Sequence, residues 1–369
     1  MGTIFDYLDW RGDIPFSEVP VGEVDNLIFS QICYVDFKKM VPASLTARPV
    51  GLLTAAKRYM NAHKEKGDAA ALGAIMPPEI ITLMTKSARS SRFNETNLIG
   101  YVNKISDNEQ KQFSALTFLI GEDTCFVAFR GTDDTIIGWK ESFNMSFMSP
   151  IPAQTEAVKY LESVADAFPE RKLYVGGHSK GGNLAVWAAV KCAQSVNERI
   201  VTIYNNDGPG FNSEFIESEQ YANTRERIRT LVPQSSIVGM LLEHEERYEV
   251  VQSTYSGLLQ HNSFSWEIMG GRFIHMDTIT EESKRIDSTL KNWLAELDID
   301  KRRQLLDSLY EILSSNNAKT LTDLNADKLS LVKAWNNLDS DSRKMIRRFI
   351  SLIIKNSKTK SNKTNRLSH

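Results

Sequence analysis

The chain is organised around Leu173-Tyr174-Val175-Gly176-Gly177-His178-Ser179-Lys180-Gly181-Gly182-Asn183, a segment followed by an alanine-rich run at 184–190. The apolar start, the glycines and the alanine-rich run predict a buried strand, a tight turn and a helix. Residues 177–181 fit the pattern G-x-S-x-G, in which a strained strand-to-helix turn projects a serine hydroxyl clear of the backbone. We therefore expect Ser179 to be a nucleophile, and the alternative is a structural glycine turn.

The glycines around this serine are expected for steric reasons. Gly177 and Gly181 lie where the incoming strand and the outgoing helix must almost touch, and Gly182 lets the start of the helix lie against the sheet. The N-terminus of that helix directs partial positive charge toward the serine, where an oxyanion would form.

The composition narrows the class of protein. The chain has 369 residues, enough for one large domain with extensions or for two domains. It is 41% hydrophobic and 24% charged with a net charge of -2, so no overall attraction to nucleic acid is expected. The N-terminus is acidic where a signal peptide would be basic, and no apolar run approaches the about 18 residues of a membrane span. Three cysteines lie in apolar segments, as is typical of buried thiols in a reducing compartment: Cys33, Cys125 and Cys192. We expect a cytoplasmic protein without a transmembrane segment.

The hydrophobic pattern changes its period twice along the chain. Residues 1 to about 95 predict mainly helices, at 26–35, about 50–65 and about 78–90. Strand-like runs then follow at 98–102, 112–120, 125–129, 173–177, 199–206, 227–232 and 248–253, with helices at about 153–168 and 213–222. Strands that alternate with helices around such a turn predict an α/β fold with a mostly parallel sheet covered on both faces.

From residue 277 the sequence becomes charged and leucine-rich, with no strand pattern. Two predicted helices each place apolar residues on one face, Leu305, Leu306, Leu309, Ile312 and Leu313 in one and Met345, Phe349, Ile350 and Ile353 in the other. These helices either pack on the rest of the protein and on each other, or form a partner- or membrane-binding module. We divide the chain into a domain at 1–276, a helical extension at 277–354 and a disordered tail at 355–369.

The segment from Ile136 to Ile151 is crowded with large apolar side chains, namely Trp139, Phe143, Met145, Phe147 and Met148. Three interpretations stay open: the segment belongs to the core, forms a mobile lid, or lines an apolar substrate site.

A serine nucleophile needs a base, and the chain has six histidines. His261 follows the last predicted strand by a loop, where an α/β architecture delivers its base, and we take it as the base. The others are less suited: His178 inside the turn, His63 in a charged helix, His244 in an acidic segment, His275 as a weaker competitor, and His369 at the end of the tail.

The acid and the oxyanion donors follow from the same architecture. Asp207 comes directly after the strand that follows the Ser179 turn, which gives the order Ser, Asp, His, although residues 206–209 are also an ordinary turn sequence. The amide of Lys180 and the backbone and hydroxyl of Thr132 are the expected oxyanion-hole donors, with Arg130 making structural pairs beneath that loop. We expect neither a metal nor a cofactor.

Two sets of motifs resemble known families. Phe129-Arg130-Gly131-Thr132 with Trp139, and then residues 177–182, resemble the class 3 lipase branch of the α/β-hydrolases over about residues 97–265. Residues 9–13, 112–115, 236–240 and 260–261 resemble more closely a bacterial lipase-like family of unknown function. The closer resemblance reaches the N-terminus but not the helical tail. The resemblance implies an α/β-hydrolase fold, and the sequence pattern adds N-terminal helices and a C-terminal helical extension. The resemblance also implies an esterase-type serine hydrolase with Ser179 as nucleophile, Thr132 at the oxyanion hole and His261 as base.

The sequence departs from the class 3 pattern at two positions. Class 3 lipases usually carry their acid in an Asp-x-Val segment, and this chain has Ser236-Ile237-Val238 there. Either Asp207 has taken that role or the triad is degraded. Lys180 replaces a common leucine, and its side chain could alter the acyl pocket.

These observations lead to one expectation and one alternative. We expect a serine hydrolase that cleaves a carboxylic ester, with an acyl ester or lipid-like substrate and no nucleic acid partner, and we leave peripheral membrane contact open. The alternative is an inactive hydrolase-fold binding or scaffold protein that acts through its helical C-terminal region.

Overall fold

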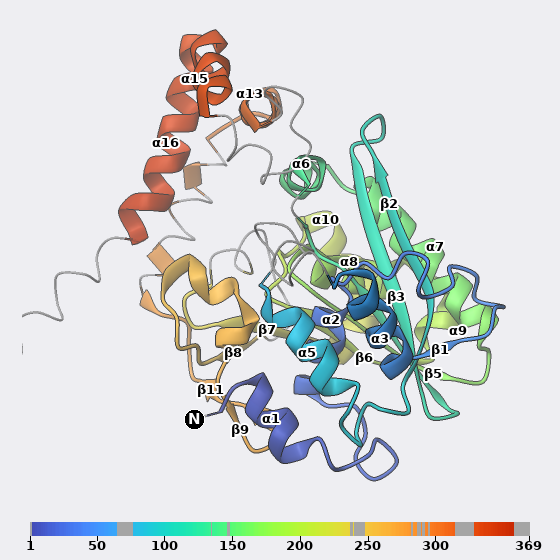
Figure 1. The fold of residues 1–369 in the computed structure, drawn as a ribbon. Coiled ribbons are helices and arrows are strands. Elements are labelled where there is room, and N and C mark those ends of the chain that lie inside the picture. Colours follow the sequence, from blue (N-terminus) through green and yellow to red (C-terminus); the bar gives the residue numbers. More distant parts are fainter. Residues whose placement is uncertain are drawn as a thin grey trace, which may run out of the picture.

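One large sheet runs through the part of the chain that the computed structural model describes, with nine strands in the order β1-β2-β3-β4-β5-β6-β7-β8-β11 (Figure 1). The structure describes residues 2–64, 77–133, 135–145, 148–236, 239, 248–281, 283–285, 289, 292–293, 296–313 and 328–357. The strands are β1 (Val50–Gly51), β2 (Asn97–Ser106), β3 (Lys111–Ile120), β4 (Thr124–Phe129), β5 (Lys172–His178), β6 (Ile200–Asn206), β7 (Ile228–Pro233), β8 (Tyr248–Val251) and β11 (His275–Met276), with β9 (Ile268–Met269) and β10 (Arg272–Phe273) pairing separately.

The centre of the sheet is parallel and its flanks are antiparallel. Strands β4 to β8 pair in parallel, whereas β1 to β4 and the β8–β11 pair are antiparallel. Phe129 lies opposite Gly177, and His178 lies opposite Asn206, so β4, β5 and β6 end at the same edge of the sheet. A ligand site of an open α/β sheet is expected at this edge.

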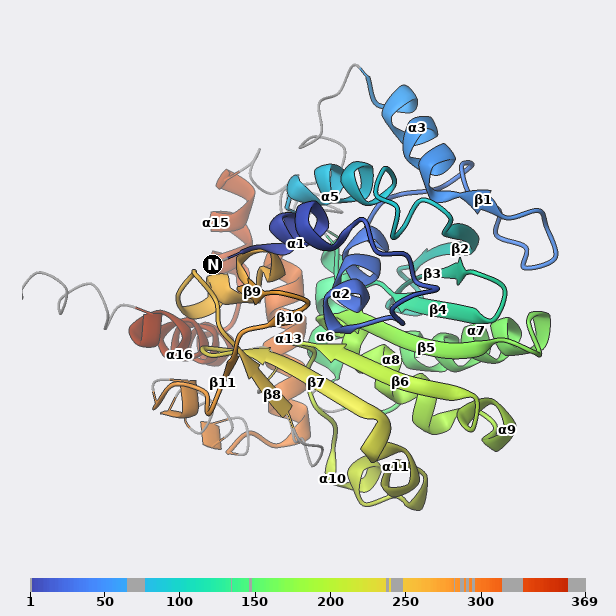
Figure 2. The same ribbon diagram turned by 90° about the horizontal axis from the view of Figure 1, so that it is seen from below.

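Helices cover both faces of the sheet (Figure 2). One face carries α1 (Ile4–Arg11), α2 (Glu23–Ile32), α3 (Leu52–Ala62) and α5 (Glu79–Ser87), and the other carries α7 (Pro152–Ala167) and α8 (Lys180–Lys191). Alternate residues of β4 divide between the two cores, with Phe126 and Ala128 on the α2 side and Val127 and Phe129 on the α8 side. Shorter helices are α6 (Ile136–Asn144), α9 (Gln194–Asn197), α10 (Ser213–Ile216), α11 (Glu219–Thr224), η1 (Arg225–Arg227), η2 (Gly257–His261) and η3 (Ser263–Ser265).

This arrangement is the α/β-hydrolase fold, as the sequence predicted. The predicted strands and helices coincide with β2 to β8 and with α2, α3, α5, α7 and α8 to within a few residues, while the helix expected at 213–222 is divided into α10 and α11. Strands β1, β9, β10 and β11 were not predicted, because two residues are too few to show a period. The three cysteines are buried free thiols, and burial raises the pKa of each to about 12.

The last described helices are α13 (Ile299–Leu313), α15 (Lys328–Asn337) and α16 (Ser340–Ser357). They share a small core of their own, formed by Trp293, Leu305, Leu338 and Ile346. Figure 1 shows α13 beside α6, which it contacts, with α15 and α16 on the other side of α13. The described helices therefore pack on one another and, through α13, on α6, while the partner- or membrane-binding module stays a prediction. The side chains of Leu306, Leu313, Phe349 and Ile353 lie outside the described residues, as does the expected tail beyond Ser357.

A buried polar cluster joins the N-terminal segments to one another. The Arg92 guanidinium donates to both carboxylate oxygens of Asp25 at 2.7 and 2.6 Å, and the Tyr7 hydroxyl donates to the same carboxylate at 2.7 Å. Arg92 also donates to the backbone oxygens of Ile14, Val19 and Pro20. The cluster thus ties α1 and the segment at Arg92 to α2, which in turn contacts β5 of the sheet.

We predict that Arg92→Ala lowers the free energy of unfolding by about 3 to 5 kcal/mol, because it leaves the Asp25 carboxylate buried without its counter-ion. Urea unfolding followed by circular dichroism measures the change. The exposed neighbour Arg89 is the matched control, and Arg89→Ala should stay within about 0.5 kcal/mol of the parent. A loss below about 1 kcal/mol for Arg92→Ala would contradict this account of the cluster.

Candidate active site

Ser179 lies at the turn between β5 and α8 in a backbone conformation that is rare for a residue with a side chain. Its φ is +59° and its ψ is -132°. The turn is held on both sides, because the Ser179 amide donates to the Asn206 carbonyl at 2.9 Å and the Gly182 amide donates to the Ser179 carbonyl at 2.9 Å. Such strain persists only where the surroundings impose it, and it is concentrated at functional sites.

The glycines of the turn are there for the predicted steric reason. A Cβ on Gly181 would lie 2.1 Å from the Phe129 carbonyl oxygen, and one on Gly177 would lie 2.3 Å from the Gly181 backbone. A Cβ on Gly182 would lie 2.2 Å from Oδ1 of Asn205. The end of β4, the turn and the start of α8 therefore meet with backbone against backbone.

Asp207 and His261 are brought together at this edge. Asp207 is fully buried, directly follows β6, and accepts a hydrogen bond on Oδ2 from Nδ1 of His261 at 2.6 Å. His261 is the last residue of η2, and its side chain is 28% exposed. Because a carboxylate only accepts, the neutral imidazole carries its hydrogen on Nδ1 and leaves a lone pair on Nε2. That is the tautomer that a general base requires.

The second oxygen of Asp207 is also held. Oδ1 accepts from the Ser236 hydroxyl at 2.5 Å and from the Gly239 amide at 3.2 Å. Ser236 is the residue found where the class 3 pattern would place its acid. It is not an anion, but it orients the carboxylate that Asp207 supplies from the neighbouring strand. A Cβ on Gly239 would lie 2.3 Å from Oδ1 of Asp207, so this position has no room for a side chain.

His178 fixes the position of His261, a role that the sequence did not reveal. Its Nε2 donates to the His261 carbonyl at 2.9 Å, and the two rings lie 4.7 Å apart. The Tyr34 hydroxyl lies 3.3 Å from both Nδ1 and the carbonyl oxygen of His178. Burial, reinforced by the neighbouring His261, lowers the pKa of His178 to about 3, so its ring stays neutral. His261 is thus held by a donor that does not titrate near neutral pH.

The loop that carries His261 is anchored by buried side chains. Oε1 of Gln260 accepts from the Ser235 amide at 2.7 Å, and the indole of Trp266 donates to the Gln260 carbonyl at 2.9 Å. Among the described residues, the Ser179 hydroxyl has no hydrogen-bond partner. Hydrogen bonds between a nucleophile and its base are often long before substrate binds, so Ser179 and His261 need not be hydrogen-bonded in the free protein.

The loop after β4 lies beside Ser179. A Cβ on Gly131 would be 3.2 Å from the Ser179 Cβ and 2.2 Å from the Tyr34 hydroxyl. Arg130 donates to Asp133 at 2.7 Å and to Asn103 at 3.1 Å, the structural pairing that was expected.

The Thr132 hydroxyl lies 2.5 Å from the Ser142 hydroxyl, which itself donates to the Gly138 carbonyl at 2.8 Å. A hydroxyl has one hydrogen, so Thr132 is the donor to Ser142, and only the backbone N–H of Thr132 remains for an oxyanion.

Lys180 has an unexpected environment. Its ammonium group is buried and donates to Oε2 of Glu141 at 2.8 Å, to the Gln112 carbonyl at 2.7 Å and to Oε1 of Gln112 at 2.6 Å. Burial lowers the pKa of Lys180, and the Glu141 carboxylate opposes that effect. The expectation that this side chain alters an acyl pocket is not supported, because its end is enclosed by these contacts. Its amide is at the first turn of α8, where N–H groups have no intrahelical partner.

The apolar segment around α6 is largely core where it is described. Ile136, Ile137, Met145 and Ile151 are buried, whereas Met148 is 40% exposed. The side chains of Trp139, Phe143 and Phe147 lie outside the described residues. Glu141 is also fully buried, so α6 is tied down at its centre.

Two other histidines lie away from the Ser179 turn. Nδ1 of His63 lies 2.9 Å from the Tyr59 carbonyl at the end of α3. His275 lies with Glu23 and Glu249, and the ligand-type atoms of the three residues are within 4.8 Å of one another. Arg229 bonds both carboxylates, at 3.1 and 2.7 Å, so a positive charge already serves them and we assign the cluster a structural role. His244 and His369 lie outside the described residues.

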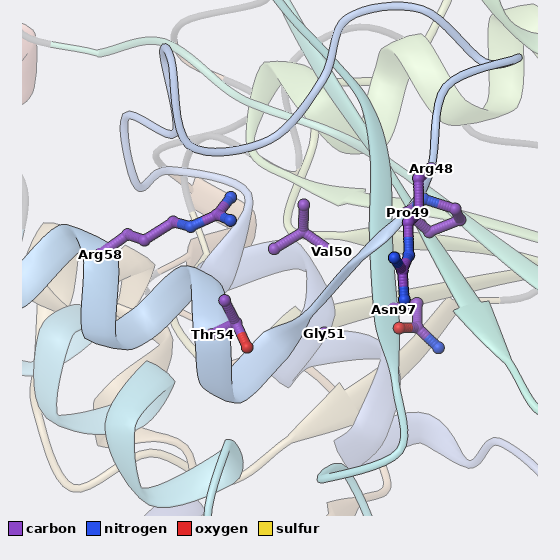
Figure 3. Close-up of a pocket in the computed structure, with 7 residues that line it drawn as sticks. All are labelled: Arg48, Pro49, Val50, Gly51, Thr54, Arg58 and Asn97. Atoms are coloured by element: carbon purple, nitrogen blue, oxygen red, sulfur yellow. The ribbon is translucent and has the colours of Figure 1, made fainter.

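A surface hollow of about 620 Å³ lies four strands away from β5 in the sheet order, at β1 and α3 (Figure 3). Its lining comprises Arg48, Pro49, Val50, Gly51, Thr54, Arg58 and Asn97. In Figure 3, Arg48 lies beside Asn97 and Arg58 extends from α3 on the other side. None of these lining residues pairs a nucleophile with a base, so the turn at Ser179 is the better candidate for an active site.

Comparison with known proteins identifies the family of this chain. A sequence model of the Mbeg1-like family matches residues 87–311, from the end of α5 into α13. The chain belongs to the Mbeg1-like family. This family is lipase-like, so the predicted membership of the lipase-like α/β-hydrolases is confirmed. No curated protein matches the sequence.

Among solved structures, this Mbeg1-like chain is similar to fungal lipases at low identity. Lipase II from Rhizopus niveus is 13% identical over 69% of this chain and 87% of the lipase, with a TM-score of 0.39. The Rhizomucor miehei lipase in its propeptide complex is 18% identical over 44% of this chain, with a TM-score of 0.32, and the match spans 58% of that lipase. Lip2 lipase from Yarrowia lipolytica is 11% identical over 63% of this chain and 80% of its own, with a TM-score of 0.32. In the described part of the chain, no helix combines the length and apolar composition that crossing a bilayer requires.

The neutral His178 leads to a prediction about stability and pH. Its folded-state pKa of about 3 lies below the value of about 6.5 expected in the unfolded chain. Between these values the unfolded state binds a proton that the folded state does not. This histidine therefore lowers the free energy of unfolding by up to about 1.4 kcal/mol for each unit of falling pH.

We predict that His178→Gln, which keeps an N–H donor but cannot titrate, loses less stability than the parent between pH 7 and pH 4. Urea unfolding at each pH measures the difference, and Tyr34 and His261 are unchanged in both proteins. Parallel curves for the parent and the variant would show that His178 is not the neutral donor.

Proposed function

We propose that this Mbeg1-like protein is a serine hydrolase that cleaves a carboxylic ester through an acyl-enzyme on Ser179. The observation that carries the proposal is the 2.6 Å hydrogen bond between Nδ1 of His261 and the buried carboxylate of Asp207. This pair lies at the edge of the sheet where a serine is held at a φ of +59°. A nucleophile, a base and an acid that orients the base are the parts of a catalytic triad.

The chemistry follows from these groups. Nε2 of His261 takes the proton of the Ser179 hydroxyl while the Ser179 oxygen attacks the ester carbonyl carbon. The negative charge that forms on the carbonyl oxygen accepts hydrogen bonds from the amides of Thr132 and Lys180. The imidazolium, stabilised by Asp207, returns its proton to the leaving alcohol. A water molecule, deprotonated by His261, then attacks the acyl carbon, and the carboxylic acid leaves as Ser179 regains its proton.

The substrate class that we propose is an acyl ester or a lipid-like ester. Met148 supports it, since this apolar side chain stays exposed in an otherwise largely buried segment that starts four positions after Thr132. We propose a cytoplasmic location, in keeping with three free thiols. We also propose that residues 1–276 form the hydrolase domain, 277–354 a helical extension and 355–369 a disordered tail.

A second candidate is a hydrolase-fold scaffold that has lost turnover. The observation in its favour is that α13, α15 and α16 build a core of their own, as an interaction module would. The two functions differ in one requirement, because only the enzyme needs the side chains of Ser179, Asp207 and His261 to act together.

We predict that Ser179→Ala abolishes hydrolysis of p-nitrophenyl esters, tested over a series of acyl chain lengths. The control is Ser163→Ala, which changes an exposed serine of α7 and should keep the parental rate. Equal turnover by the Ser179→Ala protein and the parent would rule the mechanism out.

Asp207→Asn should lower kcat by about 10⁴-fold at neutral pH, because an amide in place of the carboxylate permits the wrong imidazole tautomer. Steady-state kinetics measure the loss, and circular dichroism checks that the variant folds. A folded Asp207→Asn protein with the parental rate would remove Asp207 from the triad.

A further inference from the structure

Three consecutive residues of α6 reach three different parts of the molecule. Lys140 contacts α13, Glu141 contacts the Lys180 side chain, and Ser142 contacts the Thr132 side chain. Thr132 and Lys180 are the two residues whose amides are expected to bind the oxyanion. We propose that α6 positions the oxyanion hole through Glu141 and Ser142, and that α13 holds α6 in that position. The proposal rests on the proposed function, and it makes Glu141 and Ser142 positioning residues.

Glu141 joins four segments of the chain at one buried carboxylate. Oε2 accepts from Nζ of Lys180 at 2.8 Å and from the Gln112 amide at 3.0 Å. Oε1 accepts from the Ala153 amide at 2.9 Å, at the start of α7. The three hydrogens of the Lys180 ammonium group are used by Glu141 and by two oxygens of Gln112. Because Lys180 is the first residue of α8, the position of α6 sets the position of the amide beside Ser179.

Ser142 performs the matching task on the other side of the site. Thr132 donates to Ser142, and Ser142 donates to the Gly138 carbonyl within α6. The same loop is held at its base by the buried Arg130, which pairs with Asp133 at 2.7 Å. The Thr132 amide is therefore placed by one contact to α6 and one to the loop itself.

The third residue connects this unit to the C-terminal helices. Nζ of Lys140 lies 3.0 Å from Oδ1 of Asp307 and 4.3 Å from the centre of the Tyr310 ring, and both partners are on α13. Leu305 of α13 packs with Ile346 of α16 in the small core, so α13 is itself held by the helices behind it. Figure 1 shows α13 next to α6, with α15 and α16 beyond it. A change in the C-terminal helices would reach the oxyanion donors through a single short helix.

The energetic scale makes such positioning matter. Removal of one oxyanion donor costs an enzyme about 10² to 10³ in kcat, and a displacement of about 1 Å can cost about 10²-fold. Loss of a side chain that only holds a donor in place should cost less than loss of the donor. The donors act in the transition state, so the effect should fall on kcat and leave KM nearly unchanged.

The first test measures structure without depending on activity. Hydrogen exchange read by mass spectrometry follows the bonded amides of Arg130, Ser179 and Gly182, none of which bonds to Glu141. In Glu141→Gln these amides should exchange at least about 5-fold faster than in the parent, because α6 no longer holds both sides of the site. Glu156→Gln is the matched control: Glu156 pairs with Lys104 and Lys111 and should leave these amides unchanged.

The second test measures ester turnover. Glu141→Gln and Ser142→Ala should each lower kcat at least about 10-fold with KM within about 2-fold of the parent, and Ser142→Thr, which restores a hydroxyl, should recover most of the rate. The double variant Asp307→Asn/Tyr310→Ala should lower kcat at least about 3-fold and increase the rate of hydrogen exchange at the amides of Arg130, Ser179 and Gly182. Asp300→Asn, on an exposed part of α13, should leave both readouts at the parental values.

The outcomes separate the two proposals. Parental exchange and parental kcat in folded Glu141→Gln, Ser142→Ala and Asp307→Asn/Tyr310→Ala would overturn the positioning role. If the parent itself hydrolyses no ester, the proposed function fails. In that case the exchange rates alone decide whether α6 and α13 hold the loop and the turn. Faster exchange without turnover would keep the structural link and move it to the scaffold function.

Discussion

The constraint on which the rest of the structure depends is the contact between the end of β4 and the turn after β5. The Phe129 carbonyl leaves no room for a side chain on Gly177 or Gly181, where a Cβ would lie 2.5 or 2.1 Å away. This close contact forces Ser179 into its left-handed conformation at the tip of the turn. It also brings the loop after β4 to the serine, since Gly131 lies only two positions after Phe129, the last residue of β4. The nucleophile and its surroundings are therefore fixed by backbone packing before any polar contact is considered.

The acid shows how a site can keep its geometry while its residues change position. Asp207 comes from the strand before the one that the class 3 pattern uses, yet it reaches Nδ1 of His261 at 2.6 Å. Ser236, at the position of the lost acid, donates to the other oxygen of the same carboxylate at 2.5 Å. The ends of neighbouring parallel strands meet at one edge, so a carboxylate from either strand can serve one histidine. We therefore propose that Asp207 supplies the acid and that Ser236 orients its carboxylate.

Sequence patterns predicted the features that neighbouring residues determine by themselves. Strand periods, the glycines of the turn and an aspartate at a strand end were legible in the sequence, and they led to Ser179, Asp207 and His261. The contact of His178 with the backbone of His261 could not be predicted, because only the path of the folded chain brings these two distant residues together. The ion pair of Lys180 with Glu141 joins α8 to α6 over a separation of 39 positions in the sequence. Neither residue carries a local signal that it will be buried. What the sequence did not predict is the set of contacts that hold these candidate site residues in place.

Covalent labelling of the folded protein by a fluorophosphonate shows whether Ser179 is an activated nucleophile. Attack by an activated serine forms a stable phosphonate ester whose position mass spectrometry can assign. The account predicts stoichiometric modification of Ser179 in the parent and none in Ser179→Ala. Absence of modification in a folded parent protein, or modification confined to other residues, would contradict it.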